Sequence, residues 1–583
     1  MSDIMEKYRV PTIYSLVGVY ACYTTLNRIS CMGGVFTAIC CALTYISFIN
    51  VRDNYKAIRQ LFTCFLYKIL FLFATAIVAF CFTGSFNLYS ESELFSYASL
   101  SNWGLTIIWV LPVIFQFINF IFDNRYNEGY ELSTMQVLGG VAGIITVCLV
   151  FLYAFNPGIT SHDSFLCMDI AHNLGHVAIG NWQPPFYIMV VGLIINVFDS
   201  IYFLLLIQIV YFAFIFMLGL SFLAKIGVPR KIIILTYLFV LTNYSVILHL
   251  ITLWKDVPFM TSLLWLTILI SKLVVFEKDC INSLGWNIQL IIALVLSCFL
   301  RQNGIVPVGL TILLLPIVFK LQKRIIASIV IFIACFCLIN GPIYKYYNVV
   351  PVPGLKFFAL SNDILYTYYN NEERDSDVVE MTNEVTKDNP ESWDYNVWYT
   401  NYTGTALGDY SVLEFINIYI RAFIRNTKAM SFAILARNEY LWSVCRPEAA
   451  VDGGVNYTSQ YLPNEEFSYL IDCCIPKRSE NALTYLLTNI VQRLTSVKLL
   501  YIVYWRVGLY NILILLCMIA VYARNKRNQM KMLLPFIPIV ANCFALIIGS
   551  GWSDYRYYWP SVIIGVFLLI LTPRLCPKSE SES

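Results

Sequence analysis

The chain has 583 residues, of which 58% are hydrophobic and 13% are charged, whereas a soluble domain averages about 25% charged residues. Its mean hydropathy is +0.67. Apolar runs long enough to cross about 30 Å of hydrocarbon recur from Thr12 to Thr572. This composition excludes a soluble enzyme, a disordered chain and a disulfide scaffold. It also excludes an outer-membrane barrel, whose strands alternate with period two over about ten residues. We expect an all-α polytopic membrane protein.

The apolar runs predict a bundle of about fourteen transmembrane helices, in chain order. Their expected positions are residues 12–26, 32–49, 61–85, 103–122, 137–155, 201–224, 232–253, 257–276, 288–300, 305–319, 325–341, 499–522, 532–550 and 557–573. The runs at 12–26, 288–300 and 305–319 are short for a full crossing.

The distribution of Lys and Arg predicts the orientation of these helices. In this arrangement one side carries the basic segments, which contain Lys7 and Arg9, Arg52, Lys56 and Arg59, Arg125, Lys225, Arg230 and Lys231, Lys278, Lys320, Lys323 and Arg324, and Arg524, Lys526 and Arg527. The connections 86–102 and 156–200, on the other side, contain neither Lys nor Arg. Because basic loops stay in the cytoplasm, we expect both termini to be cytoplasmic in a plasma (inner) membrane.

Two long connections are then extracytoplasmic: the first outer loop, 156–200, and an insert. The insert, Gly341–Lys498, contains 19 acidic and 13 basic residues, and its front, 371–396, is predicted to be a solvated acidic loop. Segment 411–435 has the pattern of an amphipathic helix, which lies either along the membrane interface or inside the outer domain. The only disulfide that we expect joins Cys445 to Cys473 or Cys474. The expected domains are 1–136 (an N-terminal four-helix membrane extension), 137–341 (a membrane core), 342–498 (the extracytoplasmic domain) and 499–583 (the C-terminal helices and tail).

Polar residues that interrupt the apolar chain emerge on the same, extracytoplasmic face. They are His162, Asp163 and Asp169 after helix 137–155, Trp254, Lys255 and Asp256 after helix 232–253, Arg301, Gln302, Asn303 and Gly304 between two short helices, and Asp554 to Tyr557 before the last helix. Ionisable groups at membrane depth cost about 2.5 to 3.5 kcal/mol each, so those that are retained indicate function.

Two carboxylates and three fixed cations suit a reaction on an anionic phosphate that a lipid carries. Lys255, Arg301 and Arg556 would hold the donor phosphate, and Asp163 or Asp256 would act in catalysis, Asp163 by deprotonating an acceptor hydroxyl. Two structural interpretations stay open. In the first, Asp163 only caps a helix that begins near Ser164. In the second, Lys255 and Asp256 form an interfacial snorkelling pair.

A zinc site is a further alternative, because His172 and His176 are spaced to share one helical face, but the chain has no HExxH motif. We expect no dedicated metal site, while a requirement for Mg²⁺ or Mn²⁺ stays open. The residues expected to support the site or bind substrate are His162, Asp169, His176, Gln183, Asn303 and Tyr557.

The order of these motifs resembles the GT-C superfamily of multi-spanning glycosyltransferases, which includes protein O-mannosyltransferases and aminoarabinose transferases. The resemblance covers roughly 137–573, and it is greatest to a bacterial branch. The motifs that carry it are Asn156-Pro-Gly-Ile-Thr-Ser-His-Asp163, Trp182-Gln-Pro-Pro-Phe-Tyr187, Leu253-Trp-Lys-Asp256, Arg301-Gln-Asn-Gly304 and Arg556-Tyr557. The chain departs from the mannosyltransferases at His162, where they carry an acidic residue beside the position of Asp163, and at Gln183, where relatives often have His.

The resemblance implies a GT-C-like bundle whose first outer loop carries amphipathic helices. It also implies an inverting transferase that takes a sugar from a polyprenyl-phosphate carrier on the outer face, with Asp163 as the candidate base. The acceptor would be a glycan, teichoic acid, glycolipid or protein of the cell envelope, and no nucleic acid is expected as a partner. A polysaccharide polymerase or ligase and a secondary transporter are the alternatives.

Overall fold

The protein is described from a computed structural model, and it is almost entirely helical. The structure describes residues 15–25, 40–47, 65–88, 90–123, 126, 128–370, 376–387, 390, 395, 397–398, 407–444, 470, 480–525, 528–551 and 553–576. Cys445, Cys473 and Cys474, for which we expect a disulfide, lie outside these residues. In the described part, the one sheet is a parallel pair of two-residue strands, β1 (Ile179–Gly180) and β2 (Val349–Val350).

Nine helices in the described residues are long and apolar enough to cross a membrane. They are α4 (Phe65–Asn87), α6 (Tyr97–Asp123), α7 (Thr134–Ala154), α10 (Ile201–Lys225), α13 (Asp256–Val275), α17 (Lys323–Leu338) with its extension to Tyr346, α27 (Val507–Arg524), α28 (Gln529–Leu533) with α29 (Ile537–Gly549), and α30 (Tyr555–Tyr558) with α31 (Pro560–Leu575). The prediction of an all-α polytopic membrane protein is therefore confirmed, while fourteen helices stay a prediction. The expected helices 12–26 and 32–49 are helical over the described residues 15–25 and 40–47.

Several predicted spans are bent or divided. The expected helix 232–253 is two helices, α11 (Arg230–Thr242) and α12 (Tyr244–Leu250), which meet at 62°. The bend occurs because the side-chain oxygen of Asn243 accepts hydrogen bonds from the backbone N–H groups of Ser245 and Val246 and starts a new helix. The expected helix 499–522 divides at Arg506, between α26 (Lys498–Trp505) and α27.

The two short predicted spans are also short in the structure. They are α15 (Leu284–Phe299) and α16 (Ile305–Val318), and Arg301 and a 3₁₀ turn (η1, Gln302–Gly304) separate them. The remaining short elements of the bundle are α5 (Glu91–Leu94), α8 (His162–His172), α9 (Pro185–Phe198), α14 (Glu277–Asn282), the π-helical turn η2 (Ile339–Ile343), α18 (Tyr344–Tyr346), α25 (Ala482–Ser496) and η7 (Leu534–Phe536).

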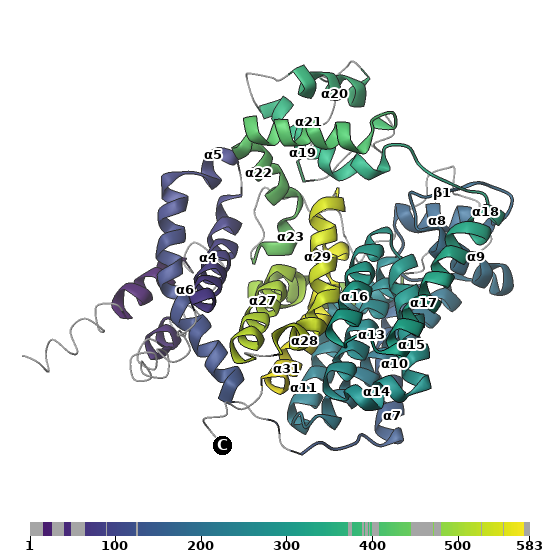
Figure 1. Ribbon diagram of the computed structural model, residues 1–583, viewed down its shortest axis with the longest axis horizontal. Helices are drawn as coiled ribbons and strands as arrows, with labels where there is room; N and C mark the ends of the chain where they lie inside the picture. The colour runs from purple at the N-terminus through teal and green to yellow at the C-terminus, as the bar shows by residue number, and fades with distance from the viewer. Residues whose placement is uncertain are drawn as a thin grey trace, which may run out of the picture.

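The bundle is centred on α13, the most deeply buried of the nine spans, which packs against α10, α15 and α31. Helix α13 also contacts α29, and α27 packs against α31, with α4 and α6 on the far side of α27 (Figure 1). The helices α4 and α6 contact the rest of the bundle mainly through α27.

The two ends of the bundle carry different side chains. At one end, which we call the basic end, Lys531 pairs with Glu277, Arg324 donates a hydrogen bond to the carbonyl of Asn282, and Lys225 lies 3.6 Å from Glu131. At the opposite end, which we call the insert end, lie α8, α9, α18 and the helices of the insert (Figure 1). The segregation of basic connections to one end agrees with the sidedness that the sequence predicts.

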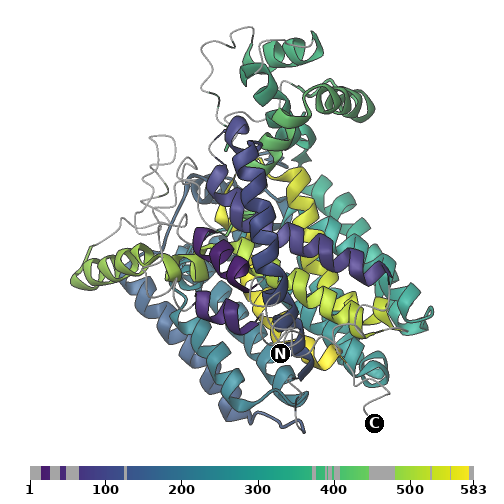
Figure 2. The same ribbon diagram turned by 90° about the vertical axis from the view of Figure 1, so that its left-hand side faces the viewer.

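The insert forms its own helical layer above the bundle, as both views show (Figures 1 and 2). Its described elements are the 3₁₀ turn η3 (Leu355–Phe357), α19 (Phe358–Asn370), α20 (Ser376–Thr386), α21 (Val412–Arg425), α22 (Thr427–Arg437) and α23 (Glu439–Trp442). Ile364, Met381 and Phe415 belong to the small core that α19, α20, α21 and α22 share, whereas α23 packs against α27 of the bundle.

Two predictions for the insert are decided by this core. The expected acidic loop 371–396 contains the helix α20, because Val378 and Met381 are apolar positions that the core buries. That prediction was therefore wrong over the residues of α20. Segment 411–435 forms α21 and most of α22, and Phe415 and Ile418 of α21 pack inside the insert. Of the two interpretations of this segment, the structure supports packing in the outer domain.

A buried ion pair joins the insert to the bundle. The guanidinium of Arg437 donates from Nε and Nη2 to the two carboxylate oxygens of Asp363, at 2.9 and 2.8 Å. Its Nη1 donates to the carbonyls of Ile547 and Ser550, at 3.1 and 2.5 Å, where α29 ends. Both side chains of the pair are fully buried.

We expect Asp363→Asn to lower the free energy of unfolding by about 3–5 kcal/mol, because it leaves the buried charge of Arg437 without its partner. The matched control is Asp377→Asn, which breaks the exposed 2.9 Å pair of Asp377 with Arg421 and is expected to cost about 0–1 kcal/mol. Thermal unfolding of both variants in one detergent measures the difference. Equal losses would contradict the assignment of Arg437 and Asp363 as the anchor of the insert.

Candidate active site

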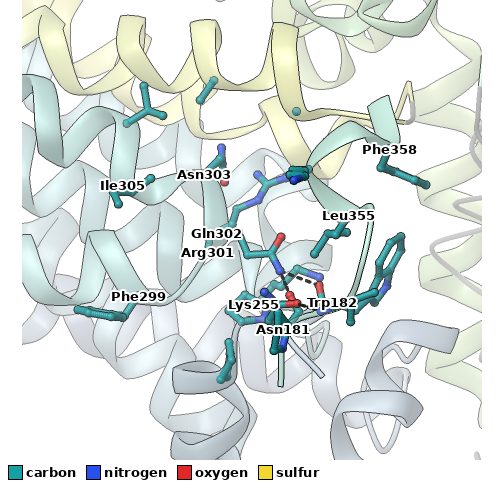
Figure 3. Close-up of a pocket in the computed structure, with 18 of the residues that line it drawn as sticks. Asn181, Trp182, Lys255, Phe299, Arg301, Gln302, Asn303, Ile305, Leu355 and Phe358 are labelled. Atoms are coloured by element: carbon teal, nitrogen blue, oxygen red, sulfur yellow. Dashed lines mark hydrogen bonds between the residues drawn. The ribbon is translucent and has the colours of Figure 1, made fainter. Parts of the chain in front are cut away.

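A cavity of about 1360 Å³ lies at the insert end. Three groups of elements line it: the loop around β1, the turn between α15 and α16, and the chain from α17 to α19, with α29 and α30 closing it. Figure 3 shows that Arg301, Gln302 and Lys255 lie between Phe299 and Ile305 on one side and Trp182 and Phe358 on the other. Most of the residues predicted to carry the chemistry therefore line this cavity.

The start of α8 positions Asp163. Ser161 caps this helix, and its hydroxyl accepts a hydrogen bond of 2.7 Å from the indole Nε1 of Trp254. Ser164 donates from its hydroxyl to the carbonyl of Leu253 at 2.9 Å. The first outer loop is thus fixed to the turn before α13. Because Ser161 is the cap and α8 begins at His162, the interpretation of Asp163 as a helix cap is wrong.

A glycine allows the two segments to approach so closely. Gly158 has a φ of +110°, and a Cβ added to it would lie 2.8 Å from the carbonyl oxygen of Ile251. A side chain at this position would therefore strain the backbone. It would also push apart the two segments that are joined by the 3.0 Å hydrogen bond from the backbone N–H of Ile159 to the carbonyl of Ile251.

Asp163 faces two cations. Its Oδ2 lies 2.7 Å from Nη1 of Arg556 and 4.0 Å from Nζ of Lys255, and its side chain is 21% exposed. Burial by itself raises the pKa of this carboxyl, but the charges of Arg556 and Lys255 outweigh burial and lower the pKa to about 2. Asp163 is therefore an ionised carboxylate at the wall of the cavity.

Lys255 points into the cavity and does not snorkel to the surface. Its Nζ donates a 2.6 Å hydrogen bond to Oε1 of Gln183, a residue of the first outer loop. Burial lowers the pKa of this ammonium from its ordinary 10.5, although Asp163 and Asp256 act in the opposite direction. The interpretation of Lys255 and Asp256 as an interfacial snorkelling pair is wrong, because Asp256 is only 1% exposed and pairs elsewhere.

Arg301, which lines the cavity, pairs with the buried Asp256. Nη1 of Arg301 lies 3.1 Å from Oδ1 of Asp256, and the guanidinium carbon lies 4.6 Å from the centroid of the Tyr557 ring. The turn that presents Arg301 is tight, since a Cβ on Gly304 would overlap the carbonyl oxygen of Ser297. Arg301 lines the cavity, whereas Asp256 lies behind it and holds it in place.

Arg556 is held between two carboxylates. Its Nε lies 2.8 Å from Oδ2 of Asp554, opposite the contact of its Nη1 with Asp163. Asp554 also accepts a 3.0 Å hydrogen bond from the backbone N–H of Arg556, and Nη2 of Arg556 donates to the hydroxyl of Tyr557 at 2.9 Å. Burial raises the pKa of Asp554, against the lowering effect of Arg556.

The structure therefore brings together a cluster of three cations and three carboxylates from four distant segments, which we call the charge cluster. Its members are Asp163, Lys255, Asp256, Arg301, Asp554 and Arg556. Each cation has an acidic partner within 4.0 Å, so the cluster has no formal net charge. A neutral arrangement of this kind lowers the cost of burying six ionisable groups.

Comparisons of the chain with protein-family models, with curated proteins and with solved structures found no match. The function is therefore argued from the geometry of the charge cluster and its cavity.

The supporting residues predicted from the sequence divide into two groups. Gln183 and Tyr557 contact the charge cluster, and Asn303 lines the cavity while its Nδ2 donates to Oδ1 of Asn542 at 3.0 Å. Asp169 and His176 are not brought to the cavity lining. His162 is exposed beside Asp163.

The alternative of a zinc site on one helical face is wrong, because α8 ends at His172 and His176 follows the turn at Gly175. Within the described ranges, no group of three His, Cys, Asp or Glu side chains could hold a metal ion. The carboxylates of the charge cluster each face a cation, which disfavours a divalent ion at this place, and we assign no step to one.

Three residues of the site were missed as candidates. Asp554 is the third carboxylate of the charge cluster, and its place two residues before Arg556 was the available signal. Lys345 and Lys356 line the cavity from the insert side. No pattern in the sequence marks these two lysines, because only the tertiary folding of the segment after α17 brings them to the cavity.

The low pKa of Asp163 predicts an acid-dependent stability. A carboxyl whose pKa is lower in the folded state than its ordinary 3.8 stabilises the fold above that value and loses this contribution as the pH falls through about 2. We therefore expect the difference in melting temperature between the wild type and Asp163→Asn to be constant above pH 3.8 and to shrink below it.

Thermal unfolding in one detergent at constant ionic strength, across this pH range, measures the difference. Asp199→Asn, at an exposed position, controls for the substitution itself. A difference between wild type and Asp163→Asn that does not change as the medium is acidified would contradict the ion pairs of Asp163.

Proposed function

We propose that the protein is a membrane glycosyltransferase that moves a sugar from a polyprenyl-phosphate donor to an acceptor of the cell envelope. The observation that carries the proposal is a single cavity that joins cations and an ionised carboxylate to an apolar side facing the lipid. The site would be extracytoplasmic in a plasma (inner) membrane, because the basic connections lie at the opposite end of the bundle.

The apolar side of the cavity suits an isoprenoid chain. Ile305 at the start of α16 is 51% exposed, and Phe544 and Ile548 on α29 are 61% and 60% exposed. All three line the cavity, and they belong to helices at membrane depth, so their exposed faces would contact lipid. A hydrocarbon chain can therefore reach Arg301 from the bilayer without crossing water.

The cations of the cavity suit the phosphate of such a donor. Arg301 and Arg556 present planar forks of N–H donors that match phosphate oxygens, and Lys255 adds a point charge between them. Asp256 and Asp554 fix the two arginine side chains from behind. This preorganised arrangement would stabilise the negative charge that develops on the leaving phosphate.

Asp163 suits the part of the general base. The acceptor hydroxyl oxygen forms a bond to the anomeric carbon of the donor sugar, the bond from that carbon to the phosphate oxygen breaks, and its electron pair leaves with the phosphate. The proton of the hydroxyl passes to the carboxylate of Asp163. When the phosphate engages Arg556 and Lys255, it weakens their hold on Asp163 and raises the basicity of the carboxylate at the moment of transfer.

Asp163→Asn is expected to lower the rate of sugar transfer by about 10²- to 10⁴-fold, because it removes the proton acceptor. Binding of polyprenyl phosphate by this variant is expected to be unchanged or tighter, since the substitution frees two cations. Transfer to envelope acceptors in proteoliposomes and titration with polyprenyl phosphate measure the two effects. Asp169→Asn, on the same helix but outside the cavity, is the matched control, and a wild-type rate for Asp163→Asn would end the assignment as base.

The donor site is tested by Arg301. Because Arg301→Ala leaves Asp256 buried without a partner, we choose the double variant Arg301→Gln with Asp256→Asn, which removes both charges and keeps their shapes. It is expected to weaken binding of polyprenyl phosphate by about 10- to 100-fold, the effect of losing a hydrogen bond to a charged group. Arg421→Ala, at an exposed position of the insert, is the control. Unchanged affinity in the double variant would contradict the phosphate site.

A further inference from the structure

The wall of the cavity that faces the insert has a different character from the side that faces the lipid. Four residues from the loop around β1 and from the chain between α17 and α19 line the cavity with this character: Trp182, Lys345, Lys356 and Phe358. Figure 3 shows Trp182 and Phe358 across the cavity from Phe299 and Ile305. We call these four residues the acceptor wall, and the inference drawn from them rests on the glycosyltransferase proposed above.

The aromatic part of the wall is rigid. The rings of Trp182 and Phe358 meet edge to face, with centroids 5.1 Å apart and planes at 86°. Gln302 Nε2 donates to the carbonyl of Trp182 at 3.1 Å, and the strand pair β1 and β2 ties this loop to the chain that leads into η3. Such a fixed pair of half-buried aromatic side chains offers the apolar face of a sugar ring a surface to stack on at a small entropic cost.

The lysines of the wall differ from the cations of the charge cluster. Each cation of the charge cluster faces a carboxylate, whereas Lys345 and Lys356 are exposed and have no carboxylate partner among the described residues. Lys356 lies 4.7 Å from the centroid of the Phe357 ring, which helps to fix it. Of the six charged side chains that line the cavity in the described part of the chain, five are basic and one, Asp163, is acidic.

The proposed donor phosphate accounts for the charges of Lys255, Arg301 and Arg556 but not for those of the two lysines. The carboxylates behind Arg301 and Arg556 orient those two groups, and the two lysines line the cavity from α18 and η3, in the segment between α17 and α19. A ligand that contacts all four residues of the acceptor wall must combine a sugar ring, which stacks on the aromatic pair, with a negative charge, which pairs with the lysines.

We propose that the acceptor wall binds the acceptor, and that the acceptor is an anionic carbohydrate whose acidic group pairs with Lys345 and Lys356 while a ring stacks on Trp182 and Phe358. The hydroxyl that receives the sugar is then presented to Asp163 from the aqueous side, while the donor enters from the lipid. The wall selects acceptors by charge.

The test uses the full-length protein in nanodiscs of neutral phosphatidylcholine and measures binding by calorimetry. The probes are tetragalacturonate, which carries a carboxylate on each ring, and maltotetraose, a neutral chain of the same length. We expect the wild type to bind tetragalacturonate about tenfold more tightly than maltotetraose, since two exposed ion pairs contribute only a few-fold each. Lys345→Gln with Lys356→Gln is expected to remove this preference, and the corresponding Arg variants are expected to keep it.

Two controls separate the wall from general charge effects. Lys428→Gln removes an exposed lysine of the insert that does not line the cavity, and it is expected to leave both affinities unchanged. Trp182→Ala is expected to weaken both tetrasaccharides alike, because it removes the stacking surface and not the charge. Equal affinity of the wild type for the two probes would overturn the proposal, as would a preference for tetragalacturonate that survives loss of both lysines.

A parallel titration with polyprenyl phosphate distinguishes this failure from failure of the proposed function. The variant without the two lysines is expected to bind polyprenyl phosphate as the wild type does. If polyprenyl phosphate binds in an Arg301-dependent way and the two tetrasaccharides bind alike, the glycosyltransferase stands and the acceptor wall is wrong. If tetragalacturonate shows the lysine-dependent preference but polyprenyl phosphate does not bind, the wall binds anionic sugars and its role as an acceptor site is overturned with the donor site.

Discussion

Mutual neutralisation of three cations and three carboxylates is the constraint on which this site depends. Arg301, Arg556 and Lys255 lie where the chain leaves the apolar bundle, and any one of them alone would carry a heavy desolvation cost there. Asp163, Asp256 and Asp554 offset that cost at distances between 2.7 and 4.0 Å. The pairing also decides which charges a ligand can meet, because Asp256 lies behind its arginine while Asp163 lines the cavity. A phosphate that enters must therefore compete with Asp163 for the cations, and with no other carboxylate that lines the cavity in the described residues.

The insert contributes to this arrangement although it supplies no member of the charge cluster. Arg437 binds Asp363 and also the last carbonyls of α29, and the backbone N–H of Ser553 donates to the carbonyl of Trp398 at 2.8 Å. The chain between α29 and Asp554 is thus held from the insert side. The contacts of the insert with α29 and Ser553 therefore help to position Arg556, and side chains of the insert line the cavity. The folding of the insert is in this way linked to the geometry of the site.

The sequence predicts the membrane-spanning class and most of the long spans because backbone N–H and C=O groups in hydrocarbon must bond to each other. A sufficiently long apolar run therefore forms a helix. The sequence predicts the positions of Asp163, Lys255, Arg301 and Arg556 for a related reason, since charge at membrane depth is rare and conspicuous. It does not predict partners. Nothing local distinguishes Asp256, which holds Arg301, from Asp163, which faces the cavity, and nothing local shows that α8 ends before His176. The bend at Asn243 and the helix α20 were missed because side-chain capping and burial by distant residues override the local pattern.

For the proposed sugar transfer, a weakly basic carboxylate would be an advantage in a cavity that is open on two sides. Water can enter from the insert side, and a strong base beside a bound sugar phosphate would also activate water for hydrolysis. Asp163 is held by Arg556 and Lys255 and has a pKa of about 2 while the site is free. In the proposed transfer it would therefore accept a proton only when the donor phosphate draws those cations away. The proposed acceptor would still have to displace water from the face of the sugar, and a wall that stacks a ring and binds its charge would provide that displacement. In the proposed reaction, charge pairing would thus limit when Asp163 acts as a base, and the acceptor wall would limit which acceptor it acts on.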